Sequence, residues 1–234
     1  MTAIKSKTLK LDYFSYMKAF FNLMKPRVMS LVIFTCAVGL LIAPVKINFT
    51  DAIFSLLAVT LGSGAAGALN MWYESDLDSL MTRTCLRPIP TGKLTRNQAL
   101  AFGILSSLIS VIVLYVFSNL IAATLLATTI LFYVFVYTIW LKRKTPQNIV
   151  IGGASGALPP LIGWAIATNG ITLEPIILFL IIFIWTPSHF WALSLYKSED
   201  YKKAKIPMLP VTSGIKTTKF NIFIYALILF PVAI

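Results

Sequence analysis

Long, continuous apolar runs separated by short polar segments dominate the chain. Each run is close to the roughly 20 residues that a helix needs to cross a bilayer. A transmembrane barrel would instead show short segments of alternating apolar and polar residues. The pattern therefore predicts an all-α, polytopic bundle of transmembrane helices. Its complete runs cover about 28–45, 51–72, 98–117, 119–141, 149–168 and 172–195.

The two ends of the chain differ from this pattern. A seventh apolar run begins near Phe220 and meets the chain end at Ile234, which is too short for a comfortable span. We therefore expect a truncated form of a longer protein whose carboxy-terminal helices are missing. Residues 1–27 are polar and basic, without a short apolar core and small-residue cleavage site. We expect them to form an uncleaved, partly amphipathic cytoplasmic arm, followed by a transmembrane domain over 28–234.

Composition and charge placement narrow the class of protein. Hydrophobic residues make up 58% of the chain and charged residues 12%, so a soluble domain would carry a largely apolar exterior. Of the 20 Lys and Arg residues, only Lys46 falls on one side of the predicted membrane. The positive-inside rule places the amino terminus and the three long polar connections in the cytoplasm. The net charge of +12 is thus a topology signal, and no nucleic-acid partner is expected.

A stripe of oxygen-bearing side chains ends the second run. Asn70, Glu74 and Asp78 are spaced four apart, so on a helix they share one face. Arg83 and Arg87 follow, also four apart. Such a set suits a phosphate ester bridged by magnesium, because Mg²⁺ prefers oxygen ligands and arginine binds phosphate in a bidentate manner. The alternative is a set of solvated surface carboxylates, which remains the interpretation for Asp76.

A second acidic loop follows the sixth run. On a helix Tyr196 and Asp200 share a face, and His189 lies about two turns before Tyr196. Asp200 is the preferred ligand for a second metal or for orienting a substrate. Lys197 is a candidate for neutralising phosphate, although lysines at this boundary also serve as plain topology signals.

The third polar connection carries Lys142 and Arg143 and leads into a helix rich in small residues. Small side chains allow close approach of a neighbouring helix or of a long ligand, and both interpretations stay open. Pro159 and Pro160 should kink this helix. The small residues are Gly152, Gly153, Ala154, Gly156 and Ala157.

With these stretches assembled, the chain resembles the UbiA superfamily of intramembrane prenyltransferases, and most closely its haem-farnesylating branch. The resemblance covers most of residues 24–214. The matching motifs are Asn70-x-x-x-Glu74-x-x-x-Asp78 with Arg83-Thr-x-x-Arg87-Pro88, the segment from Tyr137 to Trp164, the segment from Trp185 to Tyr196, Asp200-Tyr201 and Ile206-Pro-Met-Leu-Pro210.

The resemblance implies nine transmembrane helices around a central cavity, of which this chain holds about six and a half. It implies that farnesyl diphosphate ionises and that the allylic cation attacks a vinyl group of haem B, with water addition giving haem O for terminal oxidases. It also implies Mg²⁺ as cofactor, the bacterial inner membrane as location, and a haem A synthase or oxidase assembly proteins as partners.

The resemblance also assigns roles to individual residues. The implied catalytic and metal-binding residues are Asn70, Glu74, Asp78 and Asp200. The implied diphosphate-binding residues are Arg83, Arg87, Lys142, Arg143 and Lys197. The haem-binding candidates are His189, Tyr196 and Trp191, although this aromatic stretch is equally typical of an interfacial belt.

Three positions depart from the wider superfamily, which carries Asp where this chain has Met71, Glu74 and Tyr196. These departures leave the ligands of a second metal open. Other functions remain as alternatives: a prenyltransferase for an aromatic or quinone-precursor acceptor, a membrane transporter and a structural assembly factor. Acids at the membrane boundary rather than at mid-bilayer disfavour the transporter.

Overall fold

The computed structural model describes residues 12–234, and every regular element in that range is a helix. Residues 1–11 of the predicted arm lie outside the described part. The elements are α1 (Tyr13–Leu23), α2 (Pro26–Ile42), α3 (Phe49–Tyr73), α4 (Ser75–Leu80), α5 (Arg96–Phe117), α6 (Leu120–Leu131), the π-helical η1 (Phe132–Leu141), α7 (Asn148–Ala157), α8 (Pro159–Thr168), α9 (Leu173–Tyr196), α10 (Ser198–Lys203), α11 (Leu209–Thr212) and α12 (Gly214–Ala233).

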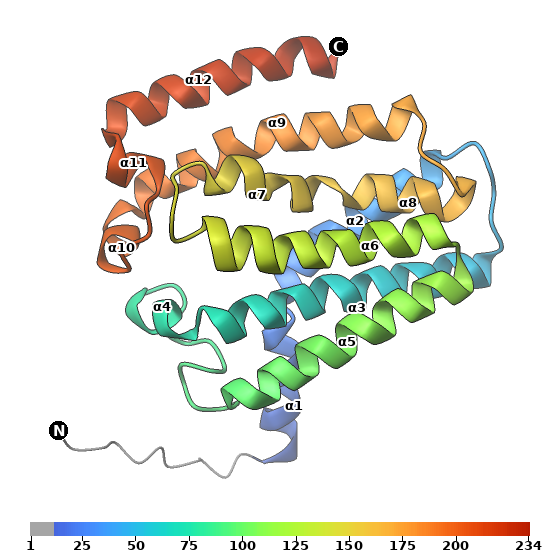
Figure 1. Ribbon diagram of the computed structural model, residues 1–234, viewed down its shortest axis with the longest axis horizontal. Helices are drawn as coiled ribbons and strands as arrows, with labels where there is room; N and C mark the ends of the chain where they lie inside the picture. The colour runs from blue at the N-terminus through green and yellow to red at the C-terminus, as the bar shows by residue number, and fades with distance from the viewer. Residues whose placement is uncertain (1–11) are drawn as a thin grey trace.

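The predicted all-α transmembrane bundle is confirmed. Within residues 12–234, six helical stretches are long and apolar enough to cross a membrane, or seven if α1 and α2 form one bent span. The long helices lie roughly alongside one another (Figure 1). The breaks between them fall where the sequence predicts: Ser118 and Asn119 separate α5 from α6, and Leu158 separates α7 from α8 just before Pro159.

The prediction for the last apolar run is wrong. Its helix, α12, begins at Gly214 rather than near Phe220 and is 20 residues long, so it qualifies as a span. Gly214 has φ of 80°, a left-handed conformation that suits glycine and lets the chain turn from α11 into α12. The first turns of α12 are polar, so the apolar run in the sequence is shorter than the helix itself.

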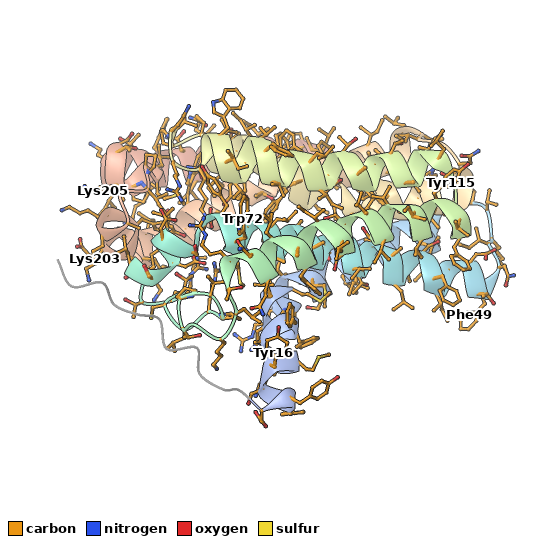
Figure 2. All side chains as sticks on the ribbon, turned by 60° about the horizontal axis from the view of Figure 1, so that its bottom comes forward. Tyr16, Phe49, Trp72, Tyr115, Lys203 and Lys205 are labelled. Atoms are coloured by element: carbon orange, nitrogen blue, oxygen red, sulfur yellow. The ribbon has the colours of Figure 1, made fainter. Side chains whose placement is uncertain are left out.

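The amino-terminal arm is helical where the structure describes it. Asp12 caps α1 by accepting from the Ser15 backbone N–H at 3.2 Å. One face of α1 buries Ala19 and Leu23 in a cluster with Met71 of α3, while other apolar residues of α1 stay exposed. The helix bends by 51° into α2 and projects from the bundle, with Tyr16 on the projecting part (Figure 2). The amphipathic character of the arm stays a prediction, because α1 carries apolar side chains on both its buried and its exposed sides.

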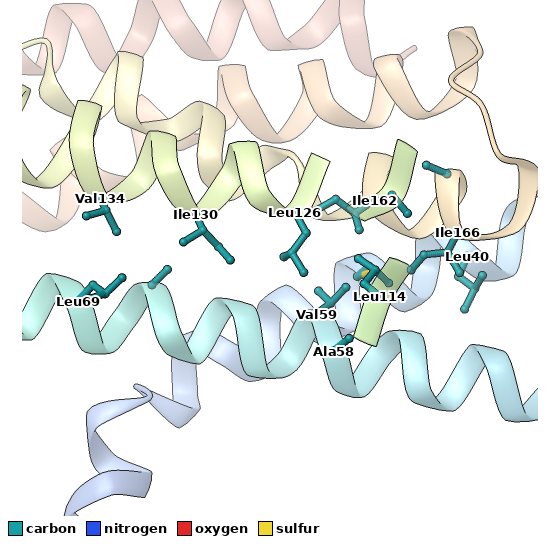
Figure 3. Close-up of a cluster of buried hydrophobic side chains, with 14 residues drawn as sticks. Leu40, Ala58, Val59, Leu69, Leu114, Leu126, Ile130, Val134, Ile162 and Ile166 are labelled. Carbon is teal, nitrogen blue, oxygen red and sulfur yellow. The ribbon is translucent and has the colours of Figure 1, made fainter. Parts of the chain in front are cut away.

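The main core lies between the long helices (Figure 3). Leu126 and Ile130 of α6 meet Val59 of α3 there. Elsewhere α2 and α8 cross with their backbones in contact, since a Cβ added at Gly163 would lie 1.9 Å from the Cys36 carbonyl oxygen. Glycine is needed at this crossing because any side chain would push the helices apart.

The polar connections gather at one end of the bundle. The segments α4, α10 and α11 and the turn between η1 and α7 all lie at the same end in Figure 1. Figure 2 shows Lys203 and Lys205 at this same end of the bundle, and Phe49 and Tyr115 at the opposite end. This arrangement brings the acidic stripe, the third connection and the second acidic loop into one region, where the candidate site lies.

Candidate active site

The acidic stripe keeps its common face although the helix is interrupted. Helix α3 ends at Tyr73 and α4 begins at Ser75, with Glu74 at the junction. The backbone N–H of Glu74 still donates to Asn70 O at 2.9 Å, and that of Asp78 to Glu74 O at 2.8 Å. The three side chains therefore stack as on one helix. All of them are buried, so their polar groups need partners.

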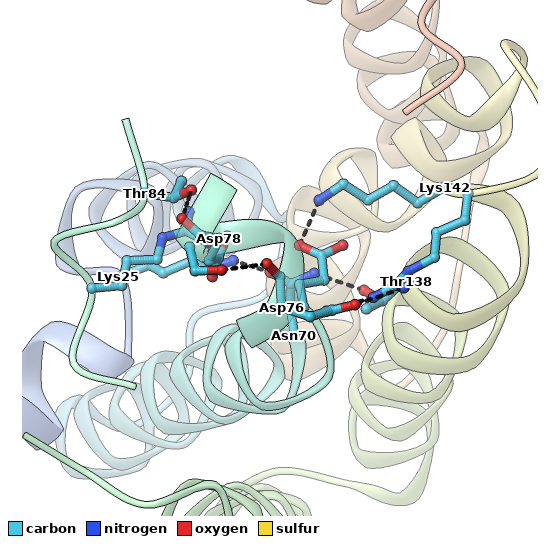
Figure 4. Close-up of polar contacts among 11 residues, drawn as sticks. Lys25, Asn70, Asp76, Asp78, Thr84, Thr138 and Lys142 are labelled. Carbon is cyan, nitrogen blue, oxygen red and sulfur yellow. Dashed lines mark hydrogen bonds and ion pairs between the residues drawn. The ribbon is translucent and has the colours of Figure 1, made fainter. Parts of the chain in front are cut away.

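Each member of the stripe is held by a basic side chain from another segment (Figure 4). Lys25 Nζ donates to Asn70 Oδ1. Lys142 Nζ lies 2.6 Å from Glu74 Oε2. Arg87 Nη1 lies 2.8 Å from both carboxylate oxygens of Asp78. Asn70 is further fixed by donating through Nδ2 to Thr138 Oγ1 at 3.0 Å.

A polar cavity of about 60 Å³ opens beside the stripe. Its charged lining consists of the two carboxylates of Glu74 and Asp78 and three basic groups, those of Arg83, Arg87 and Lys142. An excess of basic groups favours an anion, and the carboxylates favour a cation beside it. The remaining lining residues are Leu77, Met81, Thr84, Tyr137, Asn148, Ile149, Phe190, Tyr201, Ile206 and Met208.

Two oxygen atoms that belong to this lining have no hydrogen-bond partner. They are Glu74 Oε1 and Asn148 Oδ1, and both are fully buried. No group of three His, Cys, Asp or Glu side chains suited to a metal occurs within residues 12–234. A divalent cation nevertheless fits this lining, because unpartnered oxygens are the ligands that Mg²⁺ accepts and Mg²⁺ commonly needs only one or two carboxylates beside substrate phosphate.

A second, largely apolar cavity of about 120 Å³ lies deeper in the bundle. Val59, Leu126 and Ile162 are among its lining residues. Lys25 also lines it and at the same time binds Asn70 of the stripe. Lys25 therefore connects the apolar cavity to the charged end of the site.

Asp200 is not part of the cavity lining, contrary to the expected convergence of acids from both loops. Its Oδ1 accepts a hydrogen bond from Thr82 Oγ1 at 3.0 Å on the exposed side of the site. The neighbouring Tyr201 lines the cavity instead. Consecutive residues on a helix point about 100° apart, and the packing of α10 turns Tyr201 rather than Asp200 inward. Asp200 joins the second loop to the first at the surface.

Two of the expected diphosphate-binding residues also lie outside the cavity. Arg143 forms a bidentate pair with Asp76, at 2.8 and 3.0 Å, and covers the Tyr73 ring. Asp76 is thus paired rather than simply solvated. Partial burial opposes the ionisation of its carboxyl group, but the hydrogen bonds from Arg143 outweigh this effect and hold the pKa of Asp76 below its usual value. Lys197 is exposed at the break between α9 and α10.

Two of the haem-binding candidates, His189 and Tyr196, are exposed on α9, whereas the third, Trp191, is buried. His189 is exposed and stacks on Trp185, with ring centroids 4.3 Å apart. Tyr196 is 87% exposed, beyond the end of the cavity. Trp191 is buried and packs edge-on against Tyr225 of α12, 5.4 Å away. Trp191 therefore supports the packing of α9 on α12.

Comparison with known proteins gives the family. The sequence model of the UbiA prenyltransferase family matches residues 32–234. The chain belongs to the UbiA prenyltransferase family. It is therefore a multi-pass membrane protein and a prenyltransferase.

Curated relatives agree with this assignment. The chain is 72% identical to a protoheme IX farnesyltransferase of Pelagibacter ubique over 92% of its length and 71% of the relative. It is 54% identical to a protein of the same name from Ehrlichia ruminantium (strain Welgevonden), over 99% of this chain and 78% of the relative. A protoheme IX farnesyltransferase 2 of Mesorhizobium japonicum is 58% identical over 92% of this chain and 68% of the relative.

Solved structures share the fold of this UbiA prenyltransferase. A UbiA homolog from Archaeoglobus fulgidus bound to DMAPP and Mg²⁺ has a TM-score of 0.75 at 17% identity, covering 91% of this chain and 75% of that one. A digeranylgeranylglyceryl phosphate synthase structure has a TM-score of 0.76 at 18% identity, covering 93% and 76%.

Some lining residues of this UbiA prenyltransferase were not assigned a role from the sequence. Lys25 stands at the edge of an apolar run, where a lysine resembles a topology signal. Tyr137 and Phe190 sit among many other aromatic residues, and Asn148 begins a helix, where asparagine commonly serves as a cap. The sequence offered one signal for Asn148, its position as a polar residue at the start of a helix rich in small residues.

Proposed function

We propose that this chain transfers the farnesyl group of farnesyl diphosphate to a vinyl group of haem B, with addition of water, to give haem O. The observation that carries the proposal is a charged cavity and an apolar one in the same bundle, joined through Lys25. Lys25 lines the apolar cavity and donates to Asn70, the first member of the stripe whose Glu74 and Asp78 line the charged cavity. A prenyl diphosphate has the same division into a charged head and an apolar tail. The names of the curated relatives support the choice of farnesyl and haem as substrates.

The basic lining binds the diphosphate in this scheme. Arg83 and Arg87 donate hydrogen bonds from planar guanidinium groups, and Lys142 supplies a compact positive charge. Lys142 and Arg87 are held by Glu74 and Asp78, and each can shift its contact toward phosphate oxygens when a substrate enters. Lys25 binds at the junction between diphosphate and tail.

We further propose that Glu74 and Asp78, with the Asn70 carbonyl oxygen nearby, hold Mg²⁺ at the diphosphate. Bound Mg²⁺ would neutralise charge on the departing diphosphate. The structure of the magnesium-bound UbiA homolog supports a divalent cation in this fold. Asp200 and a second metal remain a prediction from the sequence, because Asp200 faces Thr82 rather than the cavity.

The reaction balances without a further reactant beyond water. The allylic C–O bond breaks and its electron pair leaves with the diphosphate. The vinyl group of haem B then forms the new C–C bond, and water adds to the resulting cation and loses a proton. The apolar cavity excludes water from the farnesyl cation until the vinyl group has attacked. The basic groups of the polar cavity stabilise the leaving anion.

The acceptor is proposed to approach along α9. Phe190 lines the polar cavity, and the adjacent His189 and Trp185 stack outside it. This aromatic surface suits the flat haem ring, with its vinyl edge toward the cavity. His189 and Tyr196 remain candidate haem contacts, while Trp191 supports them indirectly through its packing on α12.

The proposed location is the bacterial inner membrane, with the amino terminus and the charged end of the bundle on the cytoplasmic side. Clustering of the basic connections at one end supports this orientation. Haem A synthase and oxidase assembly proteins are the proposed partners, because haem O has to be passed to the enzymes that use it.

An acceptor assay tests the proposal. Purified protein in lipid nanodiscs receives farnesyl diphosphate, Mg²⁺ and either haem B or a hydroxybenzoate, and the products are separated by chromatography. We expect farnesylated haem and no prenylated benzoate. Prenylation of the benzoate alone would contradict the proposed acceptor. Excess chelator should stop turnover, and added Mg²⁺ should restore it; full activity in chelator would remove the metal from the scheme.

A further inference from the structure

Two residues that line the same polar cavity each carry a buried oxygen atom without a hydrogen-bond donor. The two atoms are Glu74 Oε1, at the junction of α3 and α4, and Asn148 Oδ1, at the start of α7. They are the only unpartnered buried side-chain oxygens in residues 12–234. Buried acceptors of this kind nearly always have a partner. Their occurrence on two residues that line one cavity therefore points to a ligand that both contact.

The orientation of the Asn148 amide is fixed by its other end. Asn148 Nδ2 donates to the Thr145 backbone carbonyl at 2.6 Å. Only the nitrogen of the amide can donate to a carbonyl, so the oxygen must occupy the other position. The side chain is fully buried, which leaves it little freedom to turn away. Asn148 thus presents its acceptor from a rigid position.

The chemistry of this pair favours a cation over a hydrogen-bond donor from the protein. Of the three basic groups in the lining, Lys142 already binds the other carboxylate oxygen of Glu74 and Arg87 binds Asp78. The third, Arg83, makes no hydrogen bond to either unpartnered oxygen. One carboxylate oxygen and one neutral amide oxygen are hard ligands, and they leave positions of an octahedral ion for phosphate oxygens and water.

We propose that Asn148 supplies a neutral oxygen ligand to the divalent cation that Glu74 holds with the substrate diphosphate. The inference rests on the proposed function and extends its metal site to α7, a segment far from the acidic stripe in sequence. It places the start of the small-residue helix directly at the diphosphate site.

Metal affinity tests the role of the oxygen atom. Mn²⁺ binding is followed by electron paramagnetic resonance in the presence of a farnesyl thiodiphosphate that does not ionise readily. Asn148→Ala should weaken Mn²⁺ binding about tenfold or more, by analogy with the losses seen around metal sites. Asn148→Asp should bind Mn²⁺ far better than Asn148→Ala, because the Asp side chain retains an oxygen at the position of Asn148 Oδ1. It should also bind Mn²⁺ at least as well as Asn148→Gln.

The Asn148→Asp variant separates ligation from a structural role. A carboxylate cannot donate to the Thr145 carbonyl, so a purely structural asparagine would fail equally as Asp and as Ala. Equal loss in both variants, or native Mn²⁺ affinity in Asn148→Ala, would overturn the inference. Thermal unfolding of each variant without metal shows how much of any loss comes from folding.

Two further variants complete the experiment. Asn148→Cys should raise the affinity for Cd²⁺ relative to Mn²⁺, because thiolate ligands prefer softer metals; an unchanged ratio counts against direct ligation. Glu74→Gln is measured in parallel. If Glu74→Gln binds Mn²⁺ with native affinity, the metal site of the proposed function is wrong. If Asn148→Ala binds Mn²⁺ with native affinity while Glu74→Gln does not, only the role proposed for Asn148 is wrong.

Discussion

At the scale of single residues, the site is a set of buried acceptors, most of which are held by a cation from elsewhere in the chain. Asn70, Glu74 and Asp78 meet Lys25, Lys142 and Arg87 respectively. Buried charges of this kind are costly unless they are paired. The pairing stabilises these buried groups, and a diphosphate with its cation offers both partners a substitute.

Lys25 gives the first prediction at this scale. Lys25→Met should raise the KM for farnesyl diphosphate about tenfold, since it removes one charge-assisted contact, with a smaller change in kcat. Lys18→Met is the matched control, because Lys18 lies exposed on α1 away from both cavities. Initial rates over a range of farnesyl diphosphate concentrations measure the effect. An unchanged KM in Lys25→Met would remove Lys25 from the diphosphate site.

Asp200 gives the second prediction at the residue scale. Because Asp200 accepts from Thr82 outside the cavity, Asp200→Asn should keep an acceptor oxygen there and reduce turnover less than about tenfold, the scale of a lost metal-site contact. Thr82→Val, which removes the donor, should have a similar effect. A loss from Asp200→Asn as large as that from Asp78→Asn would show that Asp200 ligates metal during turnover, as predicted from the sequence.

The stripe could be predicted from the sequence because its spacing of four survives the junction at Glu74 through two backbone hydrogen bonds. Which side of α10 faces the cavity could not be predicted from the sequence. Asp200 and Tyr201 are neighbours, and only packing decides which of them faces the cavity. Arg143 and Lys142 pose the same problem in the third connection, where one residue turns to Glu74 and the other to Asp76.

At the scale of helices, close backbone crossings hold the bundle together around the cavities. Helices α2 and α8 touch at Gly39 and Gly163, and a Cβ at either position would collide with a backbone carbonyl of the other helix. By contrast, a Cβ at Gly156 of α7 would meet nothing within 4 Å. Small residues in this chain therefore serve two purposes, helix packing and open space beside the apolar cavity.

This difference gives a prediction for stability. Gly163→Ala should lower the free energy of unfolding by about 1–3 kcal/mol, the usual cost of overpacking. Gly156→Ala is the matched control and should leave the thermal unfolding midpoint nearly unchanged. Unfolding in detergent, followed by circular dichroism, measures both. Equal stability of the two variants would mean that α2 and α8 do not cross as described.

The sequence predicted the existence and order of the long helices, because apolar runs of spanning length have few alternatives in lipid. It misplaced the start of α12, since Gly214 and the polar residues after it contribute no apolar signal. It also left open whether the small residues of α7 pack or line a groove. Contacts between distant segments decide that question.

At the scale of the whole molecule, the arrangement sorts charge to one end and leaves an apolar body. Asp76, Lys142 and Asp200 come from three separate connections, yet all lie at that end. The apolar cavity lies within that body. We propose that this charged end faces the cytoplasm, since basic connections gather there.

Cysteine labelling tests this orientation. Cys85 lies in the first charged connection and is partly accessible, whereas Cys36 is buried. A membrane-impermeant maleimide should label Cys85 from the cytoplasmic side only. In a Cys85→Ser background, Lys46→Cys should be labelled only from the opposite side. The reverse pattern would invert the predicted topology.

The central claim is that the buried carboxylates at the charged end hold the metal-bound diphosphate. Haem O formation in nanodiscs by Glu74→Gln and Asp78→Asn tests it most directly, with Asp51→Asn, at the other end of α3, as the matched control. We predict that the first two variants insert normally and lose more than about a hundredfold of their turnover, the scale of removing one strong electrostatic contact, while Asp51→Asn keeps native activity. Native haem O formation by both Glu74→Gln and Asp78→Asn would contradict the account.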